Sequence, residues 1–343
     1  MDRPLTDSAR PGLLLINLGT PDRPDVASVR RYLNEFLSDR RVIEIPPILW
    51  QPILKAIILR RRPARTAANY AKIWDRAQDE SPLRQITRDQ AQALQDHYGD
   101  RVRVAFAMRY GNPGIEAGLQ ALLAAGCSRI AVAPLYPQYS NATTGTALAE
   151  LFRCLNGLRH MPALRTLPPY PDHPAYIAAL RQSLDHALAG LDFTPEKILL
   201  SFHGMPAKTA ALGDPYAAHC QTTARLLRAA CGRTAAEMPI CFQSRFGPAK
   251  WLQPYLLPLA QELAGQGVRR IAVMAPGFSA DCIETLEEVD MQVRAAFLAA
   301  GGTHFATIPC LNASAPGMAM LQKLSQQLLS GWIDDPALPP AQA

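Results

Sequence analysis

A histidine follows a short apolar segment in the second half of the chain. His203 comes directly after Lys197–Phe202 and is followed by Gly204 and Pro206, a sequence typical of a tight turn. An imidazole titrates near neutral pH and its neutral nitrogen binds borderline metals, so His203 could accept protons or hold a metal ion. A hydrogen-bonded structural histidine is the plainer alternative. The corresponding turn in the first half carries Leu18, which indicates that such a turn does not need an imidazole.

Three acidic residues begin a predicted helix further along the same half. Glu284 and Glu288 are four residues apart and share one helical face, with Glu287 beside them. The helix dipole offsets part of the repulsion between carboxylates at a helix start. Such a row can pass protons or attract a cation, and an ordinary solvated helix start is the alternative. One histidine with these carboxylates provides too few ligands for a closed structural metal site and suits a metal ion in transit.

Length and composition limit the classes of protein to consider. A chain of 343 residues with 48% hydrophobic and 19% charged side chains can fill roughly two domain cores. The net charge of +6 suggests an acidic partner, or only serves solubility. No zinc-finger spacing occurs and no basic run exceeds Arg60–Arg62, so nucleic acid is not an expected partner. The seven cysteines form no Cys-x-x-Cys pair, which favours reduced thiols in a cytosolic protein.

Short apolar segments alternate with longer amphipathic ones along the whole chain. This alternation predicts an α/β protein with doubly wound parallel sheets, in which ligands bind beyond the carboxyl ends of the strands. His203 and the carboxylates both follow predicted strands, whereas no glycine-rich nucleotide motif is present. The predicted strands are Gly12–Leu18, Val102–Met108, Arg129–Ala133, Lys197–Phe202, Met238–Phe242, Arg269–Met274 and His304–Ile308. The predicted helices are Asp25–Leu37, Ile86–Tyr98, Gly114–Ala125, Tyr176–Leu188, Tyr216–Cys231, Pro254–Gln266, Glu284–Ala300 and Gly317–Trp332.

The two halves of the chain resemble each other. Leu15–Pro21 aligns with Leu200–Pro206, and the block around Arg109 aligns with the block around Arg245. This internal similarity predicts two similar domains, with about 50 extra residues inserted in the first; chance similarity is the alternative. We expect domains at 1–165 and 166–312, separated near the proline-rich stretch Met161–Pro174. Residues 313–343 are expected to form a helix and tail that pack back on the first domain.

The insertion, at about 38–81, contains an apolar helical pattern with basic flanks. Its apolar residues run from Ile48 to Leu59 and end at Arg60–Arg62. This composition suits an interfacial helix or the apolar lip of a pocket, whereas a helix packed on its own domain is the alternative. No stretch is long and apolar enough to span a bilayer, and MDRPLTDSARPG lacks the core of a secretory signal. We therefore expect a cytoplasmic protein with the option of a peripheral contact on the inner face of the cell membrane.

Several blocks together resemble the bacterial ferrochelatases. They are LLLINLGTPD near the start, AMRYGNP, PLYPQYSNATTG, LLSFHGMP, GDPY, FQSRFGPAKW and PGFSADCIETLEEVD. The blocks cover nearly the whole chain, and those around His203 and Glu284 are very specific. The sequence is therefore identified as similar to ferrochelatases of the protoporphyrin type.

The resemblance implies a lyase that inserts Fe(II) into protoporphyrin IX with release of two protons, the last step of haem synthesis. It implies two Rossmann-like domains with a porphyrin cleft between them and a mobile apolar lip. His203 and Glu284 would be the catalytic pair and also the iron-binding pair. Glu287 and Glu288 would lead protons to solvent. The residues implied for porphyrin binding are Arg109, Tyr110, Tyr136 and Trp251 in the cleft, and Arg61, Arg62 and Ser81 for the propionates.

Three departures from relatives refine these expectations. Some relatives hold a [2Fe–2S] cluster on a C-terminal Cys-x-x-Cys extension, whereas the tail SGWIDDPALPPAQA has no cysteine. We therefore expect no such cluster and no permanently bound cofactor. Coproporphyrin-using relatives usually carry a tyrosine where Leu18 stands, so protoporphyrin is favoured. Cys282 stands where some members have a histidine. We therefore expect no imidazole at that point of the proton route.

Two alternative functions stay open on the sequence. A cobalt or nickel chelatase, or a chelatase for coproporphyrin, would share the architecture. A porphyrin or haem carrier without catalysis belongs to another class of protein, and the intact His203 and Glu284 argue against it. The expected partners are protoporphyrin IX, ferrous iron and a membrane surface, and the sequence leaves the oligomeric state open.

Overall fold

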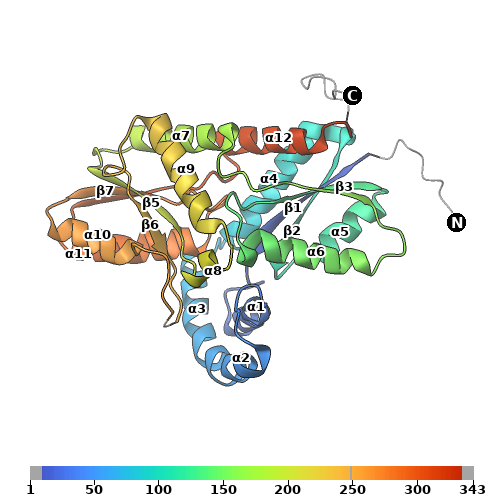
Figure 1. The fold of residues 1–343 in the computed structure, drawn as a ribbon, viewed down its shortest axis with the longest axis horizontal. Coiled ribbons are helices and arrows are strands. Elements are labelled where there is room, and N and C mark those ends of the chain that lie inside the picture. The colour runs from blue at the N-terminus through green and yellow to red at the C-terminus, as the bar shows by residue number, and fades with distance from the viewer. Residues whose placement is uncertain (1–9, 248, 334–343) are drawn as a thin grey trace.

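Two four-stranded parallel sheets form the framework of the protein (Figure 1). The computed structural model describes residues 10–247 and 249–333. The strand orders are β2-β1-β3-β4 and β6-β5-β7-β8, which confirms the predicted fold class of two similar parallel α/β units. The strands are β1 (Gly12–Gly19), β2 (Arg103–Tyr110), β3 (Arg129–Pro134), β4 (Ala163–Thr166), β5 (Lys197–His203), β6 (Ile240–Gln243), β7 (Arg270–Met274) and β8 (His304–Ile308).

Helices lie on both faces of the sheets. The α-helices are α1 (Val26–Ser38), α2 (Pro47–Ile53), α3 (Leu59–Ile73), α4 (Pro82–Tyr98), α5 (Ile115–Ala124), α6 (Thr146–Asn156), α7 (Pro174–Ala189), α8 (Lys208–Ala211), α9 (Tyr216–Cys231), α10 (Leu256–Gly265), α11 (Arg294–Ala299) and α12 (Ala315–Leu329). Three π-helices, η1 (Leu54–Ile58), η3 (Asn141–Gly145) and η4 (Glu284–Val293), and the 3-10 turn η2 (Gly99–Arg101) complete the described part of the chain.

The apolar strands are buried because both of their faces are covered. Along β1, Leu13 and Leu15 face one hydrophobic cluster, whereas Leu14 and Ile16 face another. The first cluster extends across both sheets and contains residues of α4, α7, α9 and α12, so one helical layer covers a face of each sheet (Figure 1). The opposite faces have separate clusters under α5 and α6 and under α10, η4 and α11. The two units are therefore joined through one shared core.

The internal repeat is present, but its register differs from the sequence alignment in one block. Leu15 pairs with Phe106 in the first sheet, and Leu200 pairs with Ile240 in the second. Phe106 therefore corresponds to Ile240, and Arg109 corresponds to Gln243 rather than Arg245. A shift of two residues leaves every side chain on the same face of a strand, so the apolar pattern alone could not detect it.

Strand β4 and the helices α3, α6 and α8 were not expected, and α3 continues through Arg60–Arg62, where we expected the apolar helical pattern to end. Strand β4 lies within the proline-rich stretch that we interpreted as a boundary, and helix α6 follows the π-turn η3. Strand β4 pairs only with β3 and is exposed or half-buried throughout, so it lacks the apolar pattern of a central strand. The proposed division into domains stays a prediction, because the shared core shows no single break between the sheets.

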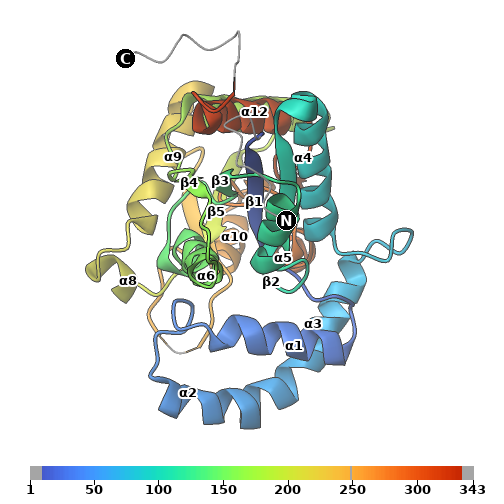
Figure 2. The same ribbon diagram turned by 90° about the vertical axis from the view of Figure 1, so that its right-hand side faces the viewer.

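The insertion forms a helical projection at one end of the molecule (Figure 2). Helices α1, α2 and α3 pack around their own small core, which includes Trp50, Leu54 and Leu59. On the outer side, Ile48 is 83% exposed and Leu49 is 61% exposed. The alternative of a helix packed on its own domain is confirmed for one face, whereas the interfacial role of the exposed apolar face stays a prediction. We call residues 38–81 the lip.

Helix α12 lies at the opposite side of the molecule from the lip (Figure 1). It packs against α7 and α4, and the hydroxyls of Tyr98 and Ser325 are 2.7 Å apart across the α4–α12 contact. The predicted tail beyond Ile333 lies outside the described residues. No described helix has both the length and the apolar character needed to cross a membrane.

Candidate functional site

His203 is the last residue of β5, a central strand of the second sheet. Its Nδ1 lies 2.7 Å from the carbonyl oxygen of Gly204. Because a carbonyl oxygen only accepts hydrogen bonds, Nδ1 must carry the proton, and the neutral ring keeps its lone pair on Nε2. The half-buried imidazole therefore has a basic nitrogen available for a proton or a metal ion.

Gly204 allows the turn after His203 to form. A Cβ at this position would lie 2.6 Å from the carbonyl oxygen of Gln243 and 3.2 Å from the Trp251 ring. The Gly204 amide donates to that same Gln243 oxygen at 2.7 Å. The turn is thus held against β6, and Trp251 lies next to the histidine turn; its role as a cleft-wall residue stays a prediction. The indole Nε1 of Trp251 is buried without a hydrogen-bond partner.

Glu284 is the first residue of η4, which follows the loop after β7. Its backbone oxygen accepts a hydrogen bond of 2.8 Å from the Gln243 side chain. The preceding loop is fixed by Asp281, whose carboxylate accepts from Thr285 Oγ1 at 2.8 Å and from Asn312 Nδ2 at 2.6 Å. These bonds hold the half-buried Glu284 at the edge of the sheet that also carries His203.

Glu288 follows one turn later and is held by Ser244. The Ser244 amide donates to Glu288 Oε1 at 2.7 Å, and the Ser244 hydroxyl donates to Oε2. Burial raises the pKa of Glu288, and the nearby Glu284 charge adds to the rise, whereas the Ser244 bonds and His203 oppose it. Glu288 therefore lies close enough to both His203 and Glu284 to be influenced by their charges. Sequence reasoning missed Ser244, although its place directly after a strand in the FQSRFGPAKW block was a usable signal.

Glu287 points away from this group and is paired. Lys72 Nζ lies 2.8 Å from Glu287 Oε1, and Gln292 Nε2 donates to Oε2 at 2.6 Å. The Glu287 side chain is only 4% exposed. Its predicted part in a proton path stays a prediction.

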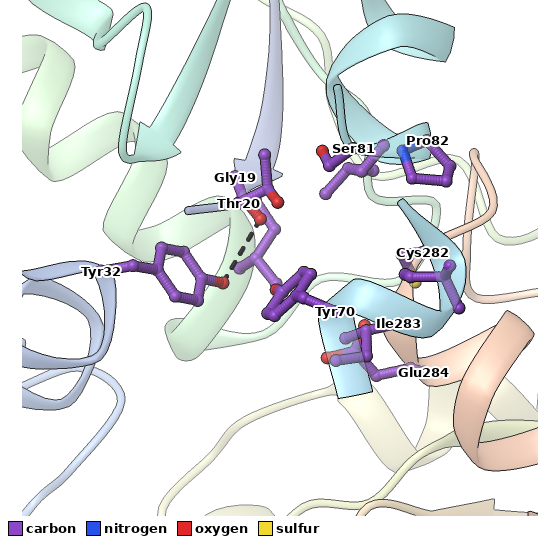
Figure 3. Close-up of a pocket in the computed structure, with 12 residues that line it drawn as sticks. Gly19, Thr20, Tyr32, Tyr70, Ser81, Pro82, Cys282, Ile283 and Glu284 are labelled. Atoms are coloured by element: carbon purple, nitrogen blue, oxygen red, sulfur yellow. Dashed lines mark hydrogen bonds between the residues drawn. The ribbon is translucent and has the colours of Figure 1, made fainter. Parts of the chain in front are cut away.

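A small pocket lies beside Glu284 (Figure 3). Its volume of about 10 Å³ has room for about one water molecule. The Tyr32 hydroxyl donates to the Gly19 oxygen at 3.3 Å, and the buried Thr20 hydroxyl has no partner. The pocket therefore brings together the end of β1, the lip and the start of η4. Its lining residues are Leu18, Gly19, Thr20, Tyr32, Tyr70, Ile73, Ser81, Pro82, Leu83, Cys282, Ile283 and Glu284.

Ser81 and the two lip arginines lie in different surroundings. Ser81 lines the pocket, is 1% exposed and caps α4 by accepting from the Arg84 amide at 3.4 Å. Arg61 is exposed on α3. The Arg62 guanidinium stacks over the Phe246 ring at 4.6 Å and so connects the lip with the loop after β6. The structure thus gathers Ser81, but not the two arginines, around Glu284.

Arg109 and Tyr110 meet at Asp39, the residue after α1. Arg109 Nη2 lies 2.6 Å and the Tyr110 hydroxyl 2.9 Å from Asp39 Oδ2, and Thr146 also donates to this oxygen. Burial favours the neutral form of Asp39, but these bonds outweigh it and lower the pKa of the carboxyl. Tyr110 is fully buried, and Tyr136 is 9% exposed with no partner for its hydroxyl. In this conformation Arg109 and Tyr110 hold the start of the lip through Asp39, whereas Tyr136 packs in the core under α5 and α6.

No three His, Cys, Asp or Glu side chains within residues 10–247 and 249–333 converge enough to hold a metal ion. All seven cysteines are free thiols. The role of His203 and Glu284 as metal ligands therefore stays a prediction.

The fold is shared with metal chelatases. The sirohydrochlorin chelatase SirB of Bacillus subtilis subspecies spizizenii, solved with cobalt, superposes with a TM-score of 0.53 at 11% identity, covering 94% of this chain and 97% of that one. SirB from Bacillus subtilis with Fe³⁺ gives a TM-score of 0.55 at 13% identity, with the same coverage. These likenesses define a chelatase fold.

The sequence identifies the family. The ferrochelatase family model matches residues 10–329. The ferrochelatase of Gluconobacter oxydans is 50% identical over 94% of this chain and 94% of its own length. That of Chelativorans sp. is 51% identical over 94% of this chain and 92% of its own length. The chain belongs to the ferrochelatase family, and the expected enzyme class, a metal-chelating lyase of haem biosynthesis, is confirmed.

Proposed function

We propose that this protein inserts Fe(II) into protoporphyrin IX, with release of two protons, as the last step of haem synthesis. Family membership supports the reaction, and the observation that carries the chemistry is the free Nε2 of His203 beside two acidic groups. Iron is a substrate here and takes the place of the two pyrrole hydrogens, so charge and atoms balance. The predictions of no [2Fe–2S] cluster and no resident cofactor remain part of the proposal.

His203 is proposed as the first proton acceptor. Its Nδ1–H is committed to the Gly204 carbonyl, which directs the lone pair of Nε2 away from the turn. A positioned base of this kind typically accelerates a proton transfer by about 10² to 10⁴. Trp251 beside the turn supports a flat aromatic wall for the macrocycle, and its unpaired Nε1–H offers a donor to a bound ligand.

Glu284 and Glu288 are proposed to receive the protons next and to attract the incoming cation. The raised pKa of Glu288 suits a carboxyl that takes up and releases a proton closer to neutral pH than an ordinary glutamate. Ser244 keeps this carboxyl in place in either state, because its amide and hydroxyl bonds hold the same side chain. The two ligands His203 and Glu284 would hold iron only in passing.

The porphyrin propionates are proposed to lie between the lip and the start of α4. Arg61 supplies an exposed guanidinium, and Ser81 opens a helix whose amino end favours anions. Arg62 would have to leave Phe246 to bind a propionate. Arg109, Tyr110 and Tyr136 are proposed to shape the cleft, the first two by holding the root of the lip through Asp39. Leu18 beside the pocket keeps protoporphyrin as the favoured substrate.

The lip is proposed to bind the inner face of the cell membrane from the cytoplasm. Ile48, Leu49, Ile53 and Ile57 are between 43% and 83% exposed, and the basic flank Arg60–Arg62 adjoins them. Apolar side chains with a basic rim suit an anionic lipid surface. Such a contact would place the exit of an apolar product near the bilayer.

Anaerobic mixing of the purified protein with Fe(II) and protoporphyrin IX tests the proposal. We expect the free-porphyrin absorbance to be replaced by that of haem, with slower reaction of coproporphyrin. Parallel reactions with Co(II) and Ni(II) compare the metals. Tight porphyrin binding without any metalloporphyrin would indicate a carrier, and faster turnover of coproporphyrin or a much stronger preference for cobalt or nickel would indicate another chelatase.

A further inference from the structure

A lysine of the lip reaches a buried carboxylate of η4. Lys72, in the last turn of α3, lies 2.8 Å from Glu287 Oε1 in η4, 215 residues away in sequence. The Lys72 side chain is 48% exposed and that of Glu287 only 4%. Lys72 is also fixed by a bond of 3.0 Å to Asn69 Oδ1. The buried partner depends on this ammonium, because an unpaired buried carboxylate is strongly unfavourable.

The second carboxylate oxygen of Glu287 accepts a hydrogen bond from within η4, and this bond depends on the backbone conformation of the helix. Gln292 Nε2 donates to Glu287 Oε2 at 2.6 Å, and the two residues are five positions apart. In an α-helix with 3.6 residues per turn, residues five apart point about 140° away from each other. A π-helix, whose backbone bonds connect residues five apart, brings them to one face. The Glu287–Gln292 bond therefore depends on the π conformation.

The same π-helix carries the proposed acids. Glu284 and Glu288 lie on either side of Glu287 in sequence and are fixed to β6 and its following loop by Gln243 and Ser244. A π-helix is rare and requires stabilising partners. Glu287 supplies one such partner on the lip side, because one oxygen binds the lip and the other binds the next turn of η4.

We propose that Lys72 is a positioning residue of the chelatase site. Its ammonium holds the Glu287 carboxylate, and Glu287 in turn holds η4 in the π conformation that places Glu284 and Glu288 beside His203. The lip thus sets the geometry of the metal and proton ligands as well as bordering the pocket beside Glu284. This inference rests on the proposed function for its catalytic consequence, whereas its effect on η4 can be measured without turnover.

Three variants of the wild-type chain test the proposal: Lys72→Met, Lys72→Arg and, as a matched control, Lys323→Met. Lys323 is an exposed lysine of α12 on the opposite side of the molecule. Hydrogen–deuterium exchange of the apo protein is expected to be about tenfold faster at the amides of Glu284–Val293 in Lys72→Met. Lys72→Arg, which keeps the charge, should restore protection, and Lys323→Met should match the wild type.

Steady-state kinetics separate positioning from general loss of structure. Lys72→Met should lower kcat by about tenfold and raise KM for Fe(II), while KM for protoporphyrin changes less than about twofold. A general loss of structure would change both KM values and the melting temperature. Wild-type exchange and kinetics in Lys72→Met, or equal damage in Lys72→Arg, would overturn the proposal.

The variant Glu287→Gln distinguishes a role of Glu287 in holding η4 in place from a role in proton transfer. Because a neutral amide needs no counter-charge, the double variant Lys72→Met with Glu287→Gln should be less impaired than Lys72→Met alone. If Glu287 instead carries protons, Glu287→Gln should abolish turnover and the double variant should not recover, which would contradict the proposal. Absence of haem formation in the wild type would refute the proposed function, but the exchange result would still decide the role of Lys72 in η4.

Discussion

His203 acts, in our proposal, through one nitrogen whose availability is set by a single backbone bond. The carbonyl of Gly204 takes Nδ1–H, so Nε2 of the neutral ring is the base. The residue could be singled out from sequence because it replaces Leu18 of the repeat and follows a buried strand. Its tautomer could not be predicted, because that depends on the turn geometry that Gly204 permits.

Replacing His203 by alanine should lower the rate of haem formation by about 100-fold or more, since a positioned base contributes about 10² to 10⁴. The fold should survive, because the bond from the Tyr216 hydroxyl goes to the backbone oxygen of His203 and is kept. Anaerobic turnover and the melting temperature check both statements. His304→Ala, at an exposed histidine at the start of β8, is the control. Near-normal turnover of the His203 variant would count against the assigned role.

Glu288 should make stability depend on pH. Burial raises its pKa, so the folded protein holds this proton at pH values where the unfolded chain, with a pKa of about 4.3, has lost it. Stability contributed by this group is therefore present at low pH and is lost as the pH rises through the raised pKa, by at most about 1.4 kcal/mol per pH unit.

Glu288→Gln should remove this loss, because the amide stays neutral. We expect the variant to gain stability relative to the wild type as the pH rises above about 4.3 and to match it below. Melting curves from pH 4 to pH 8 measure the difference. A difference that stays constant with pH, or that falls as the pH rises, would show that the carboxyl is not destabilised by burial.

At the scale of elements, the central strands were predictable from the sequence, whereas the π conformation of η4 was not. The run Gly12–Leu18 has no polar alternation because β1 is covered on both faces, and β5 and β7 share this property. The pattern over Glu284–Ala300 indicates a helix but cannot distinguish α from π backbone bonds. In the structure η4 binds Lys72, Gln243 and Ser244, which lie far away in sequence, so the local pattern carries no information on these contacts.

At the scale of the molecule, the repeat explains why so much of the site could be located from sequence. In each parallel sheet the carboxyl ends of the four strands lie at one edge. Because β5 and β7 are neighbours in the second sheet, the residues that follow them had to lie near each other. The contacts of the lip could not be predicted, because Lys72–Glu287 and Lys208–Glu44 join segments that the repeat does not relate. The lip lies outside the core shared by the two sheets, so its outer surface can be altered without disturbing that core.

Membrane association should therefore depend on the outer surface of the lip alone. Replacing Ile48 and Leu49 by serine removes two of its most exposed apolar side chains and should weaken binding to anionic vesicles about tenfold or more, given about 25 cal/mol per Å² of apolar area. Co-sedimentation with phosphatidylglycerol vesicles measures the loss, and added salt should also weaken binding because Arg60–Arg62 adjoin the surface. Leu298→Ser, at a 41% exposed leucine of α11, is the control. If both variants bind as the wild type does, the exposed face of the lip has a role other than lipid contact.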